Sequence, residues 1–534
     1  MDEPLQPSRK PLGFWKTVLA TFVRGLTASI VFSVLAFFFL VSLMIGSLLS
    51  QSAPKTIEEN SVLKINLSSI SELVTADPWS TFLPSRGEGE QSISLTQALA
   101  AIRKAKANDR IRGISLNLDS YSGGMASTAD LRAALLDFRS SGKFVVAYAD
   151  SYDQKAYYLS SVADQLILNP EGSVGLVGLA SSSLFYHQAL EKLGLKAQVF
   201  KVGIVEPFIL DQLSEPNREQ ISVYLSGLWD FILREVSASR SIPVDSLRSF
   251  ADQGLAFSEA ETFVRRRLVD TLAYRLDVEG LIARRAGVSS PKDLHVVTLA
   301  DLVSAPDPLD ATRKSKEDVV TVVYAEGEIG DNPLSSEGIT QELAQRLREL
   351  REDDKAKAIV LRINSPGGSA FLSDQIWHEV YELRKSRTIV VSMGDVAASG
   401  GYYIASAADA VVASPVTLTG SIGIFGIIPD ASELARRIGV NVDVVKTSPY
   451  ADMELSSPMA TILRPMTEDK KLLIQRQVER GYRTFLSRVS TGRDLPVARI
   501  DSIGQGRVWL GAKAKELGLV DELGGLEDGS TRPC

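Results

Sequence analysis

The chain of 534 residues is long enough for two or three domains, and an apolar content of 45% with 23% charged residues is ordinary for a globular protein. Its net charge of −7 and the lack of a basic stripe argue against a nucleic-acid-binding protein. The only cysteine, Cys534, excludes an intramolecular disulfide and a cysteine zinc cluster. The three histidines, His187, His295 and His378, match no metal-binding spacing and lie far in sequence from any glycine–serine turn, which argues against a Ser-His-Asp triad.

The N-terminal region has the pattern of an uncleaved signal anchor. Residues 1–24 are polar and net basic, and residues 25–49 carry no charge. That run exceeds the roughly 20 residues that a bilayer-spanning helix needs, and the residues after it make a poor signal-peptidase site. The basic flank predicts a single-pass protein of the inner or plasma membrane, with residues 1–24 in the cytoplasm and the remaining chain outside.

Alternating strand and helix patterns follow a polar stalk over residues 50–91, in which residues 62–67 are a strand candidate. The spacing predicts a helix over 95–106 and strands over 111–118 and 144–148. A glycine pair, Gly123 and Gly124, follows the first of these two strands. This order of elements is typical of an α/β domain.

The same order returns later at a nearly constant spacing. Gly124 and Gly368 are 244 residues apart (368 − 124), and Tyr157 and Tyr402 are 245 apart (402 − 157). A spacing of 245 also relates Ala163 to Ala408, Pro170 to Pro415, Gly175 to Gly420, Gly178 to Gly423 and Lys201 to Lys446. We therefore predict an internal duplication, with a first repeat over 92–300, a linker over 301–318, a second repeat over 319–527 and a tail over 528–534.

A serine stands at a strand-to-helix turn in the second repeat. Residues 388–393 are a short β-branched run, and from Gly401 the small and apolar residues predict a buried helix, so Ser399 falls between the two. The free N–H groups of a helix N-terminus would favour an alkoxide or oxyanion there. A second strand, over 358–364, leads into Gly367 and Gly368, which can turn an N–H outward as an oxyanion donor. Gln154 occupies the position of Ser399 in the first repeat and cannot act as a nucleophile.

Three segments resemble the signal peptide peptidase A family in its long, two-repeat form: residues 364–369 (NSPGGS), 397–402 (AASGGY) and 418–423 (LTGSIG). The resemblance implies two tandem Clp-protease/crotonase-like α/β repeats behind an N-terminal transmembrane helix. It also implies a serine endopeptidase with Ser399 as the nucleophile and the N–H groups of Gly368 and Gly400 as the oxyanion hole. Cleaved signal peptides or other hydrophobic peptides are the implied substrates, a homotetramer is the implied assembly, and no cofactor or metal is required.

The general base is the open question. A lysine can deprotonate serine only when its pKa falls several units below about 10.4, which burial in an apolar site achieves. The family supplies such a lysine from the first repeat, between a Val-Gly and a Val-Glu-Pro-Phe segment. Here residues 201–208 read KVGIVEPF, so the flanks match and the intervening lysine segment is missing.

Three interpretations of this gap remain open. In the first, Lys201 acts as a displaced base, although its repeat mate Lys446 indicates a structural end-of-strand residue. In the second, the chain is a catalytically impaired pseudopeptidase or membrane-anchored scaffold. In the third, the sequence is imperfect at this point. A crotonase-type acyl-CoA enzyme would use the same paired N–H groups. It is disfavoured because such enzymes need no Ser-Gly-Gly turn.

Overall fold

The computed structural model describes residues 13–50, 57–73, 92–118, 121–203, 210–306, 319–330, 338–453 and 461–531. The chain divides into two compact units. One contains the N-terminal helix together with residues 304–306, and the other spans Ile57–Val303 and Asp307–Cys534. The expected linker over 301–318 is described only through residue 306.

The N-terminal unit is built on helix α1 (Phe14–Ser50). Within it, Thr21–Phe39 has a mean hydropathy of 2.0 and none of its window is buried. Among the described residues this is the one helix long and apolar enough to cross a membrane. The core helix of a soluble protein would cover such a surface with other side chains, so the exposure agrees with the predicted membrane segment.

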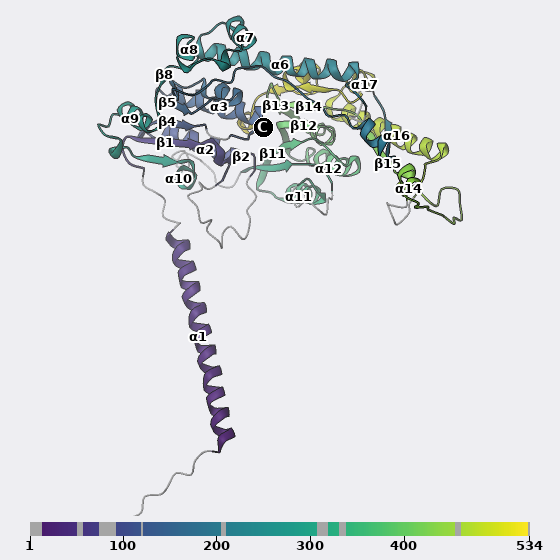
Figure 1. The fold of residues 1–534 in the computed structure, drawn as a ribbon, viewed down its shortest axis with the longest axis horizontal. Coiled ribbons are helices and arrows are strands. Elements are labelled where there is room, and N and C mark those ends of the chain that lie inside the picture. Colours follow the sequence, from purple (N-terminus) through teal and green to yellow (C-terminus); the bar gives the residue numbers. More distant parts are fainter. Residues whose placement is uncertain are drawn as a thin grey trace, which may run out of the picture. The chain divides into compact units, whose positions relative to one another are not determined.

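The first repeat is built on a six-stranded parallel sheet of order β8-β6-β5-β4-β1-β9 (Figure 1). Its central strands are short runs rich in Val, Ile and Leu, which suit a sheet buried on both faces. The strands are β1 (Ser61–Asn66), β4 (Ile111–Asn117), β5 (Phe144–Ala149), β6 (Gln165–Leu168), β8 (Thr271–Leu272) and β9 (Val296–Thr298). Helices α2 (Leu95–Ala107), α3 (Met125–Arg139) and α4 (Gln154–Ser160) follow the strands and add to the same hydrophobic core.

The second repeat has its own sheet, of order β10-β11-β12-β13-β17, in which β14 pairs with β12 in parallel and with β16 in antiparallel fashion. The strands are β10 (Val319–Glu326), β11 (Ala356–Ser365), β12 (Thr388–Ala398), β13 (Ala410–Ala413), β14 (Leu418–Gly420), β16 (Val508–Leu510) and β17 (Glu522–Leu523). Helices α11 (Gln341–Glu352), α12 (Ala370–Leu383) and α13 (Gly400–Ala405) pack on it.

The two repeats share details as well as element order, which confirms the duplication. Tyr157 on α4 donates its hydroxyl to the Leu268 carbonyl at 2.9 Å, and its mate Tyr402 on α13 donates to the Leu519 carbonyl at 2.9 Å. Each repeat also has a 26-residue helix, α6 (Glu215–Arg240) and α16 (Glu468–Arg493), that ends at a left-handed residue. The fold is therefore two tandem α/β repeats.

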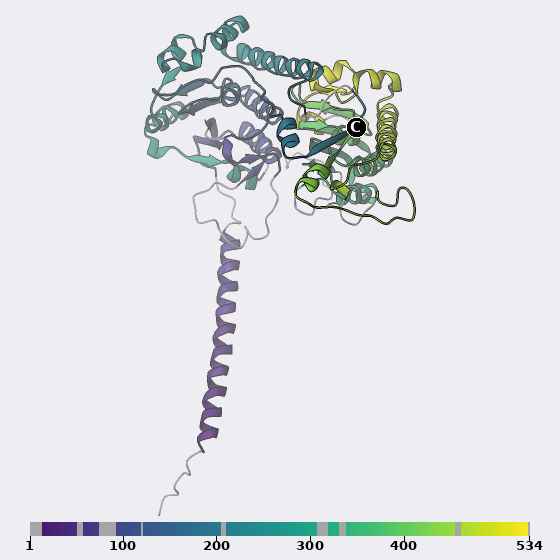
Figure 2. The ribbon, with the colours of Figure 1, turned by 45° about the vertical axis from the view of Figure 1, so that its right-hand side comes forward.

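Among the elements of the first repeat that contact the second are a strand and a long helix. Strand β7 (Lys196–Lys201) pairs in antiparallel fashion with β15 (Phe425–Asp430) and forms a two-stranded ribbon. Helix α6, teal in Figure 2, extends toward the green and yellow second repeat, where the Gln220 side chain accepts a hydrogen bond from the Val508 N–H at 3.1 Å. Both contacts bring parts of the first repeat to the region around β14 and β16.

Two boundaries differ from those expected. Residues 61–66, assigned to the stalk, form β1 inside the first sheet, because their backbone pairs with β4 and β9 and their apolar side chains are buried in the core. The expected boundary between the second repeat (319–527) and the tail (528–534) falls inside a helix. Helix α19 (Leu526–Thr531) begins at a buried Leu526 whose N–H contacts Asp130.

Candidate active site

Ser399 lies at a sharp turn between β12 and α13, as predicted. Its backbone has φ 51° and ψ −117°, a conformation that side-chain-bearing residues rarely adopt and that costs about 1–3 kcal/mol. The turn is held by the Ser399 N–H, which donates to the Gly420 carbonyl at 3.0 Å, and by the Ser399 carbonyl, which accepts from the Tyr403 N–H at 2.8 Å. A strained serine between a strand and a helix presents its Oγ at the end of the sheet.

The glycine loop after β11 packs directly against this turn. A Cβ on Gly367 would lie 2.7 Å from both the Gly400 nitrogen and the Ser399 Cβ, so only glycine permits this approach. Gly368 has φ 150°, and the N–H of the next residue, Ser369, donates a hydrogen bond to the Ile329 carbonyl at 2.7 Å. No hydrogen bond among the described residues uses the N–H of Gly368 or Gly400. Two free donors therefore lie beside the serine, the arrangement that an oxyanion needs.

A pocket of about 940 Å³ brings the predicted residues together. Ser399, Gly368, Gly400 and Lys201 all line it. Its apolar wall is formed by Val202, Ile424, Phe425, Ile427, Tyr403 and Phe485. Most of the lining belongs to the second repeat, whereas Lys201 and Val202 come from the first.

Lys201 reaches the pocket because β7 ends there. It pairs with Phe425 at the end of the ribbon, and its carbonyl accepts from the Gln475 side chain at 3.1 Å. Gly203 comes two residues later with φ 114°, and a Cβ on it would lie 2.4 Å from the Gln505 carbonyl oxygen. The segment that follows, residues 204–209, where the sequence analysis expects the family's lysine segment to be missing, lies outside the described residues.

The repeat mate Lys446 does not share this environment. It lies outside any strand, donates to the Pro449 carbonyl at 2.9 Å and pairs with Asp452 at 3.6 Å. The interpretation of both lysines as equivalent end-of-strand residues is therefore wrong. The reason is that β7 finds a pairing partner in β15, whereas residues 441–446 pair with no strand.

In the first repeat, the position that corresponds to Ser399 is occupied by Gln154. The Gln154 side-chain oxygen accepts from the Gly178 N–H at 3.0 Å, and the neighbouring Asp153 caps α4 by accepting from the Ala156 N–H at 2.7 Å. Gly124, the mate of Gly368, packs against a side chain of the second repeat: a Cβ there would lie 2.1 Å from the Asp395 Cγ. At the two described positions that correspond to Ser399 and Gly368, the first repeat thus has a glutamine in place of the serine and a glycine covered by Asp395.

Histidine and metal chemistry find no support among the described residues. None of the three histidines lines the pocket, and His187 pairs with Asp211 at 3.2 Å. Within the described part of the chain, no group of three or more His, Cys, Asp or Glu side chains could hold a metal ion.

Sequence reasoning missed part of the pocket. Ser421 has φ 51° and lines the wall, with its N–H donating to the Arg507 carbonyl at 2.7 Å. Ser421 lies in residues 418–423, one of the three segments that carry the family resemblance, and this resemblance could have identified it. The rings of Tyr403 and Phe485, with centroids 4.5 Å apart, meet only through tertiary packing.

A serine at a strained turn beside two free N–H groups is typical of hydrolases that act through an acyl-serine. The model of peptidase family S49 matches residues 137–289 and 382–532, together more than half of the chain, and a Clp protease model matches residues 312–417. The chain belongs to peptidase family S49 and is a serine peptidase by class.

Relatives along most of the chain agree. It is 35% identical over 452 residues to Protease 4 of Haemophilus influenzae, covering 82% of this chain and 72% of that protein. It is 38% identical over 451 residues to Protease 4 of Salmonella typhi, covering 82% and 71%. It is 32% identical over 443 residues to the chloroplastic serine protease SPPA of Arabidopsis thaliana, covering 81% and 64%.

Proposed function

We propose that this chain is a serine endopeptidase with Ser399 as its nucleophile and Lys201 as its general base. One observation carries the proposal: a single pocket is lined by the strained serine, by Gly368 and Gly400 with their free N–H groups, and by a lysine.

The reaction follows from this set. The Lys201 amine takes the hydroxyl proton as the Ser399 Oγ attacks the scissile carbonyl, and the N–H groups of Gly368 and Gly400 stabilise the oxyanion. The protonated lysine then gives its proton to the leaving amine, which leaves an acyl-serine. Water, deprotonated by the same lysine, hydrolyses that ester and restores the enzyme.

The proposed substrates are cleaved signal peptides and other hydrophobic peptides. The pocket wall supports this choice, because burying apolar side chains there is favourable by about 25 cal/mol per Å². A related protein of Enterococcus faecium, 33% identical over 189 residues, is named a putative signal peptide peptidase. We further propose that α1 anchors the chain in the membrane with its N-terminus in the cytoplasm, and that the working form is a homotetramer.

The deletion of the family's lysine segment belongs to the same proposal. If Lys201 is not the base, oxyanion donors and binding alone leave residual catalysis. Inserting four residues with a central lysine between Gly203 and Ile204 should then raise activity by roughly 10²–10⁴-fold. If Lys201 already is the base, the same insertion should bring no such gain.

The test is covalent labelling of the detergent-solubilised full chain with a fluorophosphonate, followed by peptide mapping. We expect labelling on Ser399 and none in Ser399→Ala, which should still fold because one lost hydroxyl leaves little cavity. Wild-type protein that folds but is neither labelled nor able to cleave a hydrophobic peptide would favour a scaffold. Labelling at another serine would show that the site is misplaced.

A further inference from the structure

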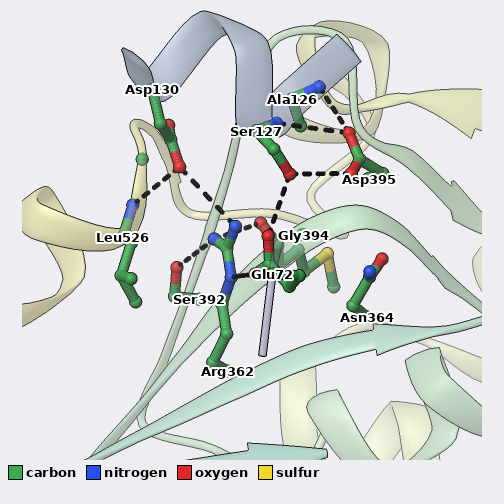
Figure 3. A network of polar contacts seen from close by, with 12 residues as sticks. Glu72, Ala126, Ser127, Asp130, Arg362, Asn364, Ser392, Gly394, Asp395 and Leu526 are labelled. Carbon is green, nitrogen blue, oxygen red and sulfur yellow. Dashed lines mark hydrogen bonds and ion pairs between the residues drawn. The ribbon is translucent and has the colours of Figure 1, made fainter. Parts of the chain in front are cut away.

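A buried polar network joins the two repeats, and Figure 3 shows its members. Asp395, on β12 of the second repeat, accepts hydrogen bonds from the Ala126 N–H at 2.6 Å and the Ser127 N–H at 3.2 Å through Oδ1. Its Oδ2 accepts from the Ser127 hydroxyl at 2.8 Å. Both partners lie in the first turn of α3, in the first repeat. Asp395 therefore caps a helix of the other repeat.

Helix α3 has no cap of its own. Its N-cap residue is Gly124, which offers no side chain, so the first N–H groups of the helix would otherwise be left unpaired. A carboxylate suits this end of the helix because it complements the positive end of the helix dipole. The glycine is also necessary for the contact, since a Cβ on Gly124 would lie 2.1 Å from the Asp395 Cγ.

On its own strand, Asp395 lies in a bulge four residues before Ser399. Ile363 pairs with Met393 and Ser365 pairs with Ala397, so β12 has two more residues than β11 between these two pairs. The bulge ends where the Val396 N–H donates to the Asn364 side chain at 3.1 Å. Beyond it, β12 pairs with β14 instead of β13. Bulges next to active sites redirect the strand that follows, here the one leading into the serine turn.

The residues of β12 just before the bulge are also linked to α3, through Arg362 and Glu72. Arg362, a fully buried residue on β11, donates to the Ser392 hydroxyl at 3.0 Å and to the Met393 carbonyl at 2.9 Å. Its Nε donates to Glu72 at 2.6 Å, and Glu72 accepts from the Ser127 hydroxyl at 2.9 Å. The bulge itself, through Asp395, and the residues just before it, through Arg362 and Glu72, are thus both tied to the first turn of α3.

We propose that Asp395 is a positioning residue through which the first repeat, which has no nucleophile, sets the direction of β12 and so the place of Ser399. The inference rests on the proposed function, because it needs Ser399 to react. The first repeat thereby acts on the serine from two directions, through the α3 cap and through the ribbon that carries Lys201. A serine displaced by about 1 Å from its oxyanion donors loses on the order of 10²-fold in rate.

The test separates positioning from helix capping. Asp395→Ala should slow fluorophosphonate labelling of Ser399 at least about tenfold and lower the Tm. The double variant Gly124→Asp/Asp395→Ala returns a carboxylate to the N-cap of α3 itself, where the backbone is extended and accepts any residue, but leaves β12 untied. We expect it to recover the Tm and to remain slow in labelling. Asp395→Asn keeps the shape and the acceptor oxygen, so its labelling should stay within about threefold of wild type.

A matched control is Asp153→Ala, which removes the cap of α4 and touches only the first repeat at this point. It should lower the Tm with labelling unchanged. Full labelling in the double variant, or labelling of Asp395→Asn as slow as that of Asp395→Ala, would overturn the inference. If the double variant does not fold, equal labelling rates for Asp395→Ala and Asp153→Ala would overturn it, and a slower Asp395→Ala would support it. A wild-type protein that is not labelled at all refutes the proposed function, and the inference with it.

Discussion

Asp130 on α3 should make the stability of this protein depend on pH across the neutral range. Its side chain is 8% exposed and lies 3.6 Å from the Arg362 guanidinium, with Glu72 and Asp395 as further negative groups nearby. Burial raises the pKa of Asp130 from 3.8 to about 7; Arg362 opposes this shift and Glu72 adds to it. Arg362 thus pairs with two carboxylates, Glu72 and Asp130, and Asp130 is the one whose pKa is raised.

The sign and size of the effect follow from linkage. Between about pH 4 and pH 7 the folded state holds a proton on Asp130 that the unfolded state has released. The free energy of unfolding therefore falls as pH rises through this window, by up to about 1.4 kcal/mol per pH unit. Over about three units the total is roughly 4 kcal/mol, and above the folded pKa no further change is expected from this group.

The assay is the Tm of wild type and Asp130→Asn in detergent between pH 5 and pH 8.5. Asparagine keeps an acceptor for the Leu526 N–H and removes the charge, so the variant should be more stable than wild type by a small margin at pH 5, about one unit into the window, and by a larger margin at pH 8, beyond its end. Asp137→Asn is the matched control, because Asp137 is on the same helix but 57% exposed in a pair with Lys106. A difference between wild type and Asp130→Asn that is the same at pH 5 and pH 8 would refute the reasoning.

Three further predictions concern the pocket. Gln154→Ala should leave Ser399 labelling and peptide cleavage nearly unchanged, because the first repeat has no open site; a loss equal to that of Ser399→Ala would move the active site. Lys201→Met keeps the apolar stem, and if Lys201 is the base it should lower kcat by roughly 10²–10⁴-fold and flatten the alkaline side of the pH profile; unchanged turnover would send the search to another base. Gly368→Val should abolish labelling, because a Cβ at this position would lie 2.1 Å from the Ile329 carbonyl oxygen. Gly330→Ala is the control and should leave labelling unchanged, because a Cβ there meets open space. Labelling kept in Gly368→Val would argue against the Gly368 N–H as an oxyanion donor.

Local sequence patterns were enough to predict the strand, turn and helix around Ser399. The β-branched run over 388–393 and the small residues after Gly400 encode the turn within one stretch of chain, and β12 extends further only because of its bulge. The repeat spacing likewise predicted two sheets. These features depend on neighbours in sequence, which is why residue patterns alone indicate them.

Contacts between the repeats could not be predicted in the same way. Asp395 caps a helix more than 250 residues away, and Glu72, assigned to a stalk, pairs with a buried arginine of the second sheet. Lys201 and Lys446 occupy equivalent positions of the two repeats, yet only the segment before Lys201 pairs as a strand. Tertiary pairing, which a periodicity does not reveal, decides these environments.

The ribbon between β7 and β15 has a consequence for how this chain tolerates changes in length. Side chains alternate between the two faces of a strand, so moving the register by one residue turns every side chain of β7 to the opposite face. A single insertion or deletion between Lys196 and Phe200 would turn the Lys201 side chain to the opposite face of the ribbon, even though no pocket residue had been replaced. Changes after Val202 leave the register of the ribbon intact. The deletion proposed above, which lies beyond Gly203, would therefore keep Lys201 at the pocket.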